Sequence, residues 1–199
     1  MSTDSRMLVE ALGRWADRME LAAPELNALD GQLGDGDLGA TLSKCAANIR
    51  KAIAPPPADI PGIFKACAIA CTKASGSSLG TLLAVAFMTL TKETAGKNQI
   101  GDAEWPGLLA AVRDALSARG GARLGDKTVL DAIEAVRLGL EGTGPEGRLS
   151  AAKAALEAAI ADFRGRENRI GRARIFAERS RGLDDPGMIA ARHMLESIG

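Results

Sequence analysis

Apolar residues recur at helical spacing along almost the whole chain, and this pattern limits the possible folds more than any other feature. Met7, Leu8, Leu12 and Trp15 form the first apolar stripe. Proline is favoured in the first turn of a helix, so a second, short helix is expected to start at Pro24. Further helical segments are expected at residues 38–53, 63–74, 81–93, 108–122, 125–140, 148–166 and 184–199. The segment 81–93 is almost wholly apolar, which predicts a central helix.

Stretches rich in proline and glycine separate these segments. Residues 54–62 contain four prolines, which cannot lie inside a helix. The pair Gly120 and Gly121 predicts a helix end. Asp126 and Asp185 are expected to cap the helices that follow them, with Pro186 in the first helical position. Residues 170–182 could be helical or irregular, so the pattern predicts about eight to ten helices and no convincing strand.

The composition agrees with this pattern. Ala and Leu dominate, while the chain has no Tyr, 4 Phe and 2 Trp, so the predicted fold class is all-α. The 25 basic and 25 acidic residues balance, which argues against a general nucleic-acid binder. We find no signal peptide and no run of apolar residues long enough to span a membrane. Cys45, Cys67 and Cys71 form no paired framework, so we expect a cytoplasmic protein with reduced thiols in its core.

Three carboxylates lie unusually close together in the stretch "LDGQLGDGDLG". Asp30, Asp35 and Asp37 fall within eight positions with no Lys or Arg between them, and they should repel one another unless a positive group lies among them. Their oxygen atoms suit Mg²⁺ or Ca²⁺. An EF-hand is excluded because Ala46 stands where that loop needs its bidentate Glu. A surface turn without any metal is the alternative.

Three more loops have residues that suit the binding of phosphate. Ser75, Ser77 and Ser78 precede a helix whose N-terminus would favour an anion, although a serine that only caps this helix gives the same pattern. The stretch "GGARLGDKT" is not a P-loop because Asp126 separates Gly125 from the lysine, so that lysine is expected to be a surface or pairing residue. Residues 164–181 contain seven Arg and two Glu, which suits phosphate or an acidic partner. A solvated helix face with internal ion pairs is the interpretation that these residues alone favour.

Four stretches together resemble one known family. "LDGQLGDGDLG", "ASGSSLG", "GARLGDKTVLDA" and "GRARIFAERSRGLDDPG" resemble the L subunit, or nucleotide-binding domain, of dihydroxyacetone kinases, in the order of that family and over nearly the whole chain. The resemblance implies a single domain over residues 1–199, built as an eight-helix antiparallel barrel with the nucleotide at one end. It also implies two Mg²⁺ ions held by Asp30, Asp35 and Asp37. The residues that it implies for binding ATP or ADP are Leu38, Gly39, Ala40, Thr41, Ser75, Gly76, Gly120, Val129, Arg172, Asp185, Pro186 and Gly187.

The activity implied by the resemblance is transfer of a phosphoryl group to a small keto sugar that a separate K-type subunit holds. This transfer needs positioning and charge neutralisation, which the metals and Arg172 would supply, so no side chain of this chain is assigned as a catalytic residue. The nucleotide is either ATP that is turned over or bound ADP that a phosphotransferase-system protein rephosphorylates, and a homodimer is left open. Leu38 stands where the family often has His or Thr. The alternatives are a regulatory paralogue that binds Mg-nucleotide without transfer, and a helical scaffold with a degenerate site.

Overall fold

The computed structural model describes residues 2–74, 78–142, 144 and 146–198, and the described part is almost entirely helical. The prediction of an all-α fold is therefore confirmed. The α-helices are α1 (Ser5–Leu33), α2 (Leu38–Ala52), α3 (Ile60–Thr72), α4 (Ser78–Glu93), α5 (Trp105–Gly120), α6 (Val129–Leu140), α7 (Arg148–Arg164) and α8 (Pro186–Glu196). Two 3₁₀ segments, η1 (Asp102–Glu104) and η2 (Arg172–Ser180), complete the helical elements.

Helix α1 is longer than the sequence pattern predicts. Pro24 lies inside this helix and does not start a second one. An internal proline removes one backbone hydrogen bond and costs about 3 kcal/mol. The buried stripe continues on both sides of it, from Met19 and Ala22 to Leu26 and Leu33, so packing of this face outweighs the local cost.

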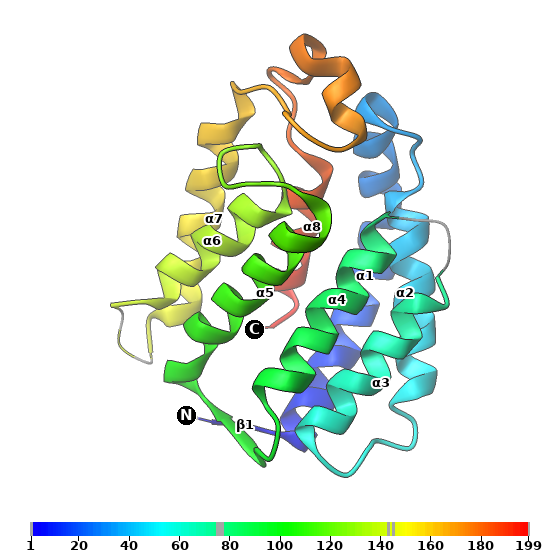
Figure 1. Ribbon diagram of the computed structural model, residues 1–199, viewed down its shortest axis with the longest axis vertical. Helices are drawn as coiled ribbons and strands as arrows, with labels where there is room; N and C mark the ends of the chain where they lie inside the picture. Colours follow the sequence, from blue (N-terminus) through cyan, green and yellow to red (C-terminus); the bar gives the residue numbers. More distant parts are fainter. Residues whose placement is uncertain (1, 75–77, 143, 145, 199) are drawn as a thin grey trace.

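The helices follow one another around the molecule. Each helix packs against the next one in the chain, and α8 also contacts α1 and α6 (Figure 1). These contacts follow the order that a closed barrel would need, while the antiparallel barrel itself stays a prediction. At one end of the molecule, the last turns of α1 and α5 lie near the first turns of α2, α4, α6 and α8. Loops and helix ends from distant parts of the sequence therefore meet there.

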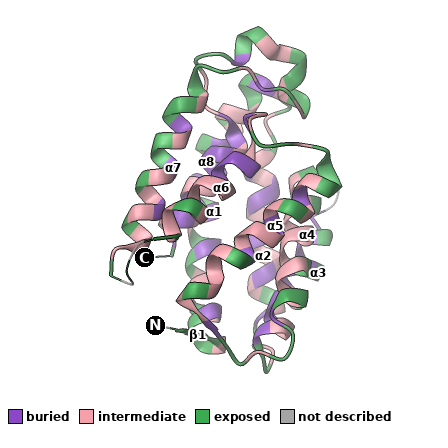
Figure 2. Cartoon of the chain, turned by 60° about the vertical axis from the view of Figure 1, so that its left-hand side comes forward, coloured by how far each residue is buried: buried purple, intermediate pink, exposed green. Residues whose placement is uncertain are grey.

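The core consists mostly of aliphatic side chains and small residues, and Figure 2 shows buried residues on the inward faces of the helices. Helix α4 contacts both core clusters, but within the described part of the chain Gly80 is its only buried residue, so the prediction of a central helix is met only in part. Cys45, Cys67 and Cys71 are buried free thiols, as expected. Burial raises the pKa of Cys67 to about 12, so this thiol stays protonated at neutral pH.

Two further observations concern the remaining segments. Residues Ser2–Asp4 (β1) pair antiparallel with Gln99–Gly101 (β2), a pairing that the sequence pattern did not predict because each strand has only 3 residues. In the described part of the chain, no helix combines the length and the apolar character that crossing a membrane requires.

Candidate functional site

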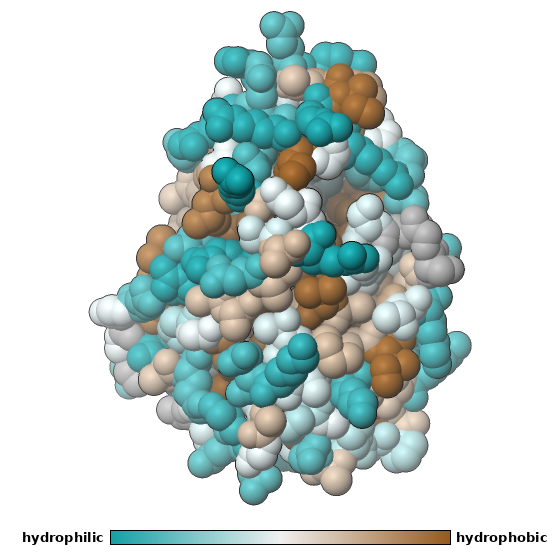
Figure 3. Space-filling view, viewed as in Figure 1, coloured by the Kyte–Doolittle hydropathy of each residue, from teal (hydrophilic) through white to brown (hydrophobic). Residues whose placement is uncertain are grey.

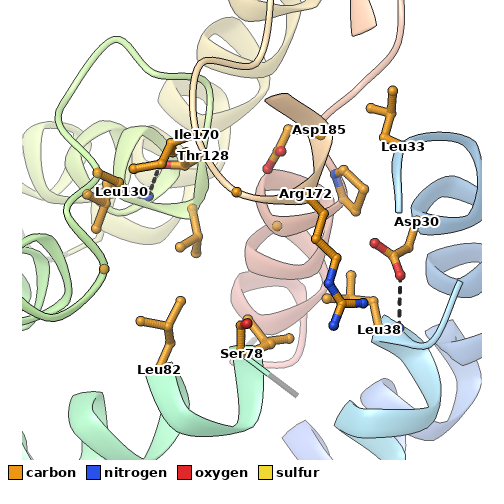
Figure 4. A pocket seen from close by; sticks show the side chains of 18 of the residues that line it. Asp30, Leu33, Leu38, Ser78, Leu82, Thr128, Leu130, Ile170, Arg172 and Asp185 are labelled. Atoms are coloured by element: carbon orange, nitrogen blue, oxygen red, sulfur yellow. Dashed lines mark hydrogen bonds between the residues drawn. The ribbon is translucent and has the colours of Figure 1, made fainter. Parts of the chain in front are cut away.

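A pocket of about 610 Å³ opens at the end of the molecule where the helix ends meet (Figure 4). Its lining comes from α1, α2, α4, α5, α6 and α8 and from the segment that leads into η2. Figure 4 shows Asp30 on one side of the pocket and Leu82 and Leu130 on the other, and Leu116 and Val129 also line the pocket. The pocket thus joins a charged region to an apolar wall, which is the usual character of a site for a small molecule with one charged end.

The acidic cluster is assembled by the end of α1 and the turn that follows. Asp30, Asp35 and Asp37 each offer one carboxylate oxygen, and these oxygens lie within 4.8 Å of one another. Asp30 belongs to the last turn of α1, and its Oδ2 accepts hydrogen bonds from the backbone N–H of Asp37 at 3.0 Å and of Leu38 at 3.3 Å. Gly36 has a φ of 74°, a left-handed conformation that turns the chain back toward Asp30.

The charges of this cluster are only partly compensated within the protein. Arg172 forms an ion pair with Asp35 across the pocket, while Asp30 and Asp37 have no ion pair among the residues that the structure describes. The donor set consists of carboxylate oxygens alone, with Asp35 and Asp37 exposed. Hard oxygen donors of this kind fit Mg²⁺, which keeps several waters and shares substrate phosphates. The residues present therefore fit the metal that the family resemblance implies.

The first turn of α2 is less open than a phosphate-binding turn would be. The backbone N–H of Ala40 donates to the Asn27 side chain at 3.1 Å, and that of Thr41 donates to the Asp37 carbonyl at 2.9 Å. Gly39 is buried where α2 crosses α1, and a Cβ at this position would overlap the Ala23 backbone. The glycine thus allows the close approach of two helices, and of this turn only Leu38 lines the pocket.

The opposite wall forms where α8 begins beside α6. Pro186 and Gly187 line the pocket next to Val129 and near Gly120, and Asp185 caps α8 as predicted by accepting from the backbone N–H of Met188 at 2.9 Å. Burial raises the pKa of Asp185 to about 6, against the hydrogen bonds that it accepts. Ser75 and Gly76 lie outside the described residues, and Ser78 and Leu79, which follow them in the chain, line the pocket.

Lys127 differs most from its prediction, because it is fully buried and is not a surface residue. Its Nζ donates to the carbonyl oxygens of Arg166 and Ser180 at 2.8 Å each and to that of Arg164 at 3.3 Å. Burial lowers the pKa of Lys127, and Asp185 and Asp184 oppose this effect. Lys127 thereby ties the loop before α6 to the segment that carries η2. No pattern in the sequence marks this lysine, because its partners are backbone atoms 37 to 53 residues away.

The conformation of Lys127 also corrects the predicted cap of α6. Lys127 has a φ of 62°, and the chain turns there so that Thr128, and not Asp126, caps the helix. Thr128 accepts from the backbone N–H of Leu130 at 3.2 Å, and Asp131 accepts from that of Thr128 at 2.8 Å, which completes a capping box. The carboxylate of Asp126 accepts instead from the backbone N–H of Arg123 at 2.8 Å.

The arginines of residues 164–181 divide into those that form an ion pair and those that form none within the described chain. Four of these arginines form ion pairs: Arg164 with Asp184, Arg166 with Asp162, Arg172 with Asp35 and Arg181 with Glu167. Only the last pair is internal to the stretch, so the expectation of a helix face with internal ion pairs is met for Arg181 alone. Asn168 is buried at the base of this stretch, where its Nδ2 donates to the Lys127 carbonyl at 2.8 Å and to Asp185 Oδ2 at 2.7 Å. The stretch therefore forms one side of the pocket and does not act as a separate surface helix.

Comparison with known proteins gives consistent matches. The family model described as "DAK2 domain" matches residues 32–199. The chain is 28% identical over 191 residues to the ADP-binding subunit DhaL of a PTS-dependent dihydroxyacetone kinase from Lactococcus lactis, covering 96% of this chain and 94% of that protein. It is 32% identical over 200 residues to D-erythrulose kinase from Mycolicibacterium smegmatis, covering 92% of this chain and 33% of that protein.

Solved structures share the fold. The dihydroxyacetone kinase of C. freundii in its native form matches with a TM-score of 0.75 and 24% identity, over 96% of this chain and 33% of that chain. The same kinase in complex with AMP-PNP and Mg²⁺ matches with a TM-score of 0.73 and 22% identity, over 99% of this chain and 34% of that chain. This chain thus spans about a third of the length of that kinase, and the likeness is one of fold.

Proposed function

Because this chain belongs to the DAK2 domain family, we propose that it is the Mg²⁺- and nucleotide-binding subunit of a dihydroxyacetone-type kinase, acting as a single domain over residues 1–199. It would serve transfer of a phosphoryl group to a small keto sugar held by a K-type partner. The observation that carries this proposal is the meeting of Asp30, Asp35 and Asp37 at the charged end of a pocket of about 610 Å³. The similarity to the ADP-binding subunit from L. lactis supports a nucleotide as the ligand.

The pocket offers each part of the nucleotide a suitable surface. Asp30, Asp35 and Asp37 would hold two Mg²⁺ ions, which supply neutralisation of the phosphate charge when bound. Arg172 already lies beside Asp35, so its guanidinium is placed to contact a phosphate at this end. The wall of Leu82, Leu116 and Val129 would cover the apolar face of the base and exclude water.

The chain's own contribution to the transfer would be positioning. The three carboxylates are fixed by α1 and by the hydrogen bonds that Asp30 accepts, so the phosphate end of the nucleotide would be held at one point. Transfer of a phosphoryl group gains most of its rate from such alignment and from the electrostatic stabilisation of the transferred group. We assign no side chain of this chain a role in covalent chemistry.

Single carboxylate substitutions test the proposal. Asp35→Asn and Asp37→Asn should each weaken Mg²⁺-dependent binding of ADP and ATP by about 100-fold or more, because each removes a charged ligand. Asp114→Asn, which removes an exposed carboxylate on α5, is the matched control and should bind as the parent chain does. Calorimetric titration measures the affinities, and circular dichroism confirms the helical content. Mg²⁺-dependent affinity retained in both site variants would refute the metal assignment.

The form of the nucleotide can be decided by analysing what the purified chain carries. We expect near-stoichiometric ADP on denaturation and its loss after treatment with EDTA, in line with the name of the relative from L. lactis. A chain that carries no nucleotide but binds Mg-ATP reversibly would instead indicate turnover of ATP. The two outcomes separate a resident coenzyme from an exchangeable substrate.

A further inference from the structure

Basic and apolar side chains are exposed in the segments next to the pocket-lining residues Ala122, Ile170 and Ala173. We call this group the basic rim, and it comprises Arg123, Leu124, Arg169, Arg174, Ile175 and Arg179. None of its four arginines has an ion pair among the residues that the structure describes, in contrast to the four paired arginines of the same region. Glu178, which is exposed, lies between Arg174 and Arg179 in the sequence. A chain with no net charge therefore concentrates uncompensated positive charge at one end.

Exposed apolar side chains accompany this charge. Ile175 is 79% exposed and Leu124 is 50% exposed. A single exposed isoleucine is ordinary on a protein surface, but here it projects from the same short segment as Arg174 and Arg179. The guanidinium of Arg179 lies 5.2 Å from the centre of the Phe176 ring, within the range of a cation–π contact. Figure 3 shows that the end of the molecule where η2 lies in Figure 1 is mostly hydrophilic, with separate hydrophobic groups among the polar ones.

The basic rim rests on a rigid base. Three carbonyl oxygens of the stretch 164–180 are held by Lys127, and the backbone N–H of Arg169 donates to the Asp126 carbonyl at 3.1 Å. The backbone N–H of Asn168 donates to the Ser180 hydroxyl at 2.9 Å, which joins both ends of the segment. Ile175 is thus exposed on a segment that hydrogen bonds already hold in one conformation. Little conformational entropy would therefore be lost when a partner binds.

The basic rim also adjoins the place where phosphate would lie. Gly171, Arg172 and Ala173 line the pocket, and they lead directly into Arg174 and Ile175. An acceptor held by another protein must come within about 3–3.5 Å of the transferred group. Its carrier therefore has to touch the mouth of the pocket, and η2 projects beyond the helix ends there (Figure 1).

We propose that the basic rim is the docking surface for the partner protein that holds the phosphoryl acceptor. This proposal rests on the proposed function. The partner surface would be acidic opposite the four arginines and would offer an apolar pocket to Ile175. Charge pairs across such an interface speed up association and fix orientation, while a buried apolar residue at its centre carries much of the affinity.

Kinetics with a K-type subunit loaded with dihydroxyacetone test the docking surface. Ile175→Glu should raise the KM for this subunit at least tenfold, while kcat at saturating subunit and the Kd for Mg-ADP stay within twofold. The double variant Arg174→Glu, Arg179→Glu should also raise this KM and flatten its dependence on NaCl. Leu138→Glu is the matched control, because Leu138 is 52% exposed and lies at the far end of α6, whose first residue lines the pocket.

Each outcome has a definite meaning. A KM within twofold of the parent value for both rim variants would overturn the docking proposal, while transfer by the parent chain would still uphold the proposed function. Failure of the parent chain to bind Mg-ADP or to transfer would overturn the proposed function, and the docking proposal with it. Analytical ultracentrifugation of the chain alone gives a further check. A shift from oligomer to monomer in Ile175→Glu would assign the rim to a second copy of this chain instead.

Discussion

Replacing Lys127 by Met tests how the pocket is held together. The change keeps the length and the apolar stem of the side chain but removes all three donors of the ammonium group. Lys127 is fully buried, and its partners are the carbonyl oxygens of Arg164, Arg166 and Ser180. The substitution therefore removes the side-chain part of the link between the loop before α6 and the segment from α7 to α8. The hydrogen bonds from Asn168 to the Lys127 carbonyl and from Arg169 to the Asp126 carbonyl remain.

The expected loss of stability depends on whether each of these three carbonyl oxygens keeps another hydrogen-bond donor. That of Arg164 also accepts from the backbone N–H of Gly182 at 2.8 Å, and that of Ser180 accepts from Leu183 at 3.3 Å. The carbonyl of Arg166 has no second donor among the residues that the structure describes, so it would become a partly buried acceptor without a protein partner there. One such group costs about 1–3 kcal/mol, and hydrogen bonds to a charged group contribute about 1.5–3 kcal/mol each.

A part of this loss is recovered, because the unfavourable burial of the ammonium group, which lowers the pKa of Lys127, is absent when Met takes its place. We therefore expect Lys127→Met to reduce the free energy of unfolding by about 2–4 kcal/mol. Urea denaturation measures this value, with Lys65→Met as the control for loss of an exposed lysine on α3. In the variant, hydrogen exchange of residues 165–183 should become faster than in the parent chain, and this increase should exceed any increase in α2. A change below about 0.5 kcal/mol, with exchange unaltered, would refute the role given to Lys127.

Two further predictions concern pH and helix packing. Folding raises the pKa of Asp185 from 3.8 to about 6. Between about pH 4 and pH 6 the folded chain therefore binds more protons at this carboxyl than the unfolded chain does. The free energy of unfolding should fall by roughly 1–3 kcal/mol as the pH rises from about 4 to 6. This slope should be absent from urea denaturation of Asp185→Asn, and an identical slope in the variant would contradict the assignment. Gly39→Ala should lower the free energy of unfolding by about 1–3 kcal/mol because its Cβ would overlap Ala23, whereas Gly13→Ala on α1, with open space around it, should raise it by about 0.5–1 kcal/mol. Thermal denaturation of the two variants compares them directly, and equal effects would show that the helices can separate at Gly39 without cost.

The helical fold could be predicted from the sequence because the signals that specify it are local. Apolar spacing, the Asp185 cap with Pro186 and the left-handed Gly121 after α5 each depend on a few neighbouring residues, and the structure contains all of them. Pro24 was misjudged for the same reason. Its local preference favours a helix start, whereas the continuous buried stripe of α1 is satisfied only by contacts with other helices.

The candidate site could be predicted to the extent that its parts are close in sequence. Asp30, Asp35 and Asp37 belong to one helix end and one turn, so their approach to 4.8 Å required no knowledge of the rest of the fold. The ion pair of Arg172 with Asp35 joins residues that lie far apart in the sequence, and nothing in either local stretch indicates it. The family resemblance implied that both residues belong to the site, but it gave no indication that they contact each other.

Lys127 and the basic rim show why counting charges could not separate structural from functional cations. Residues 123–127 and 164–181 contain one lysine and eight arginines, and the sequence presents all of them as similar polar residues. The structure divides them by their partners: Lys127 is buried on backbone carbonyls, four arginines pair with carboxylates, and four have no ion pair within the described chain. Apart from the contact of Arg179 with the Phe176 ring, the chain gains little stability from the last group, because neighbouring like charges repel. Binding of a negatively charged partner, as proposed above, would account for their place next to the pocket-lining residues 170–173. The buried lysine explains how a segment so rich in positive charge keeps its shape.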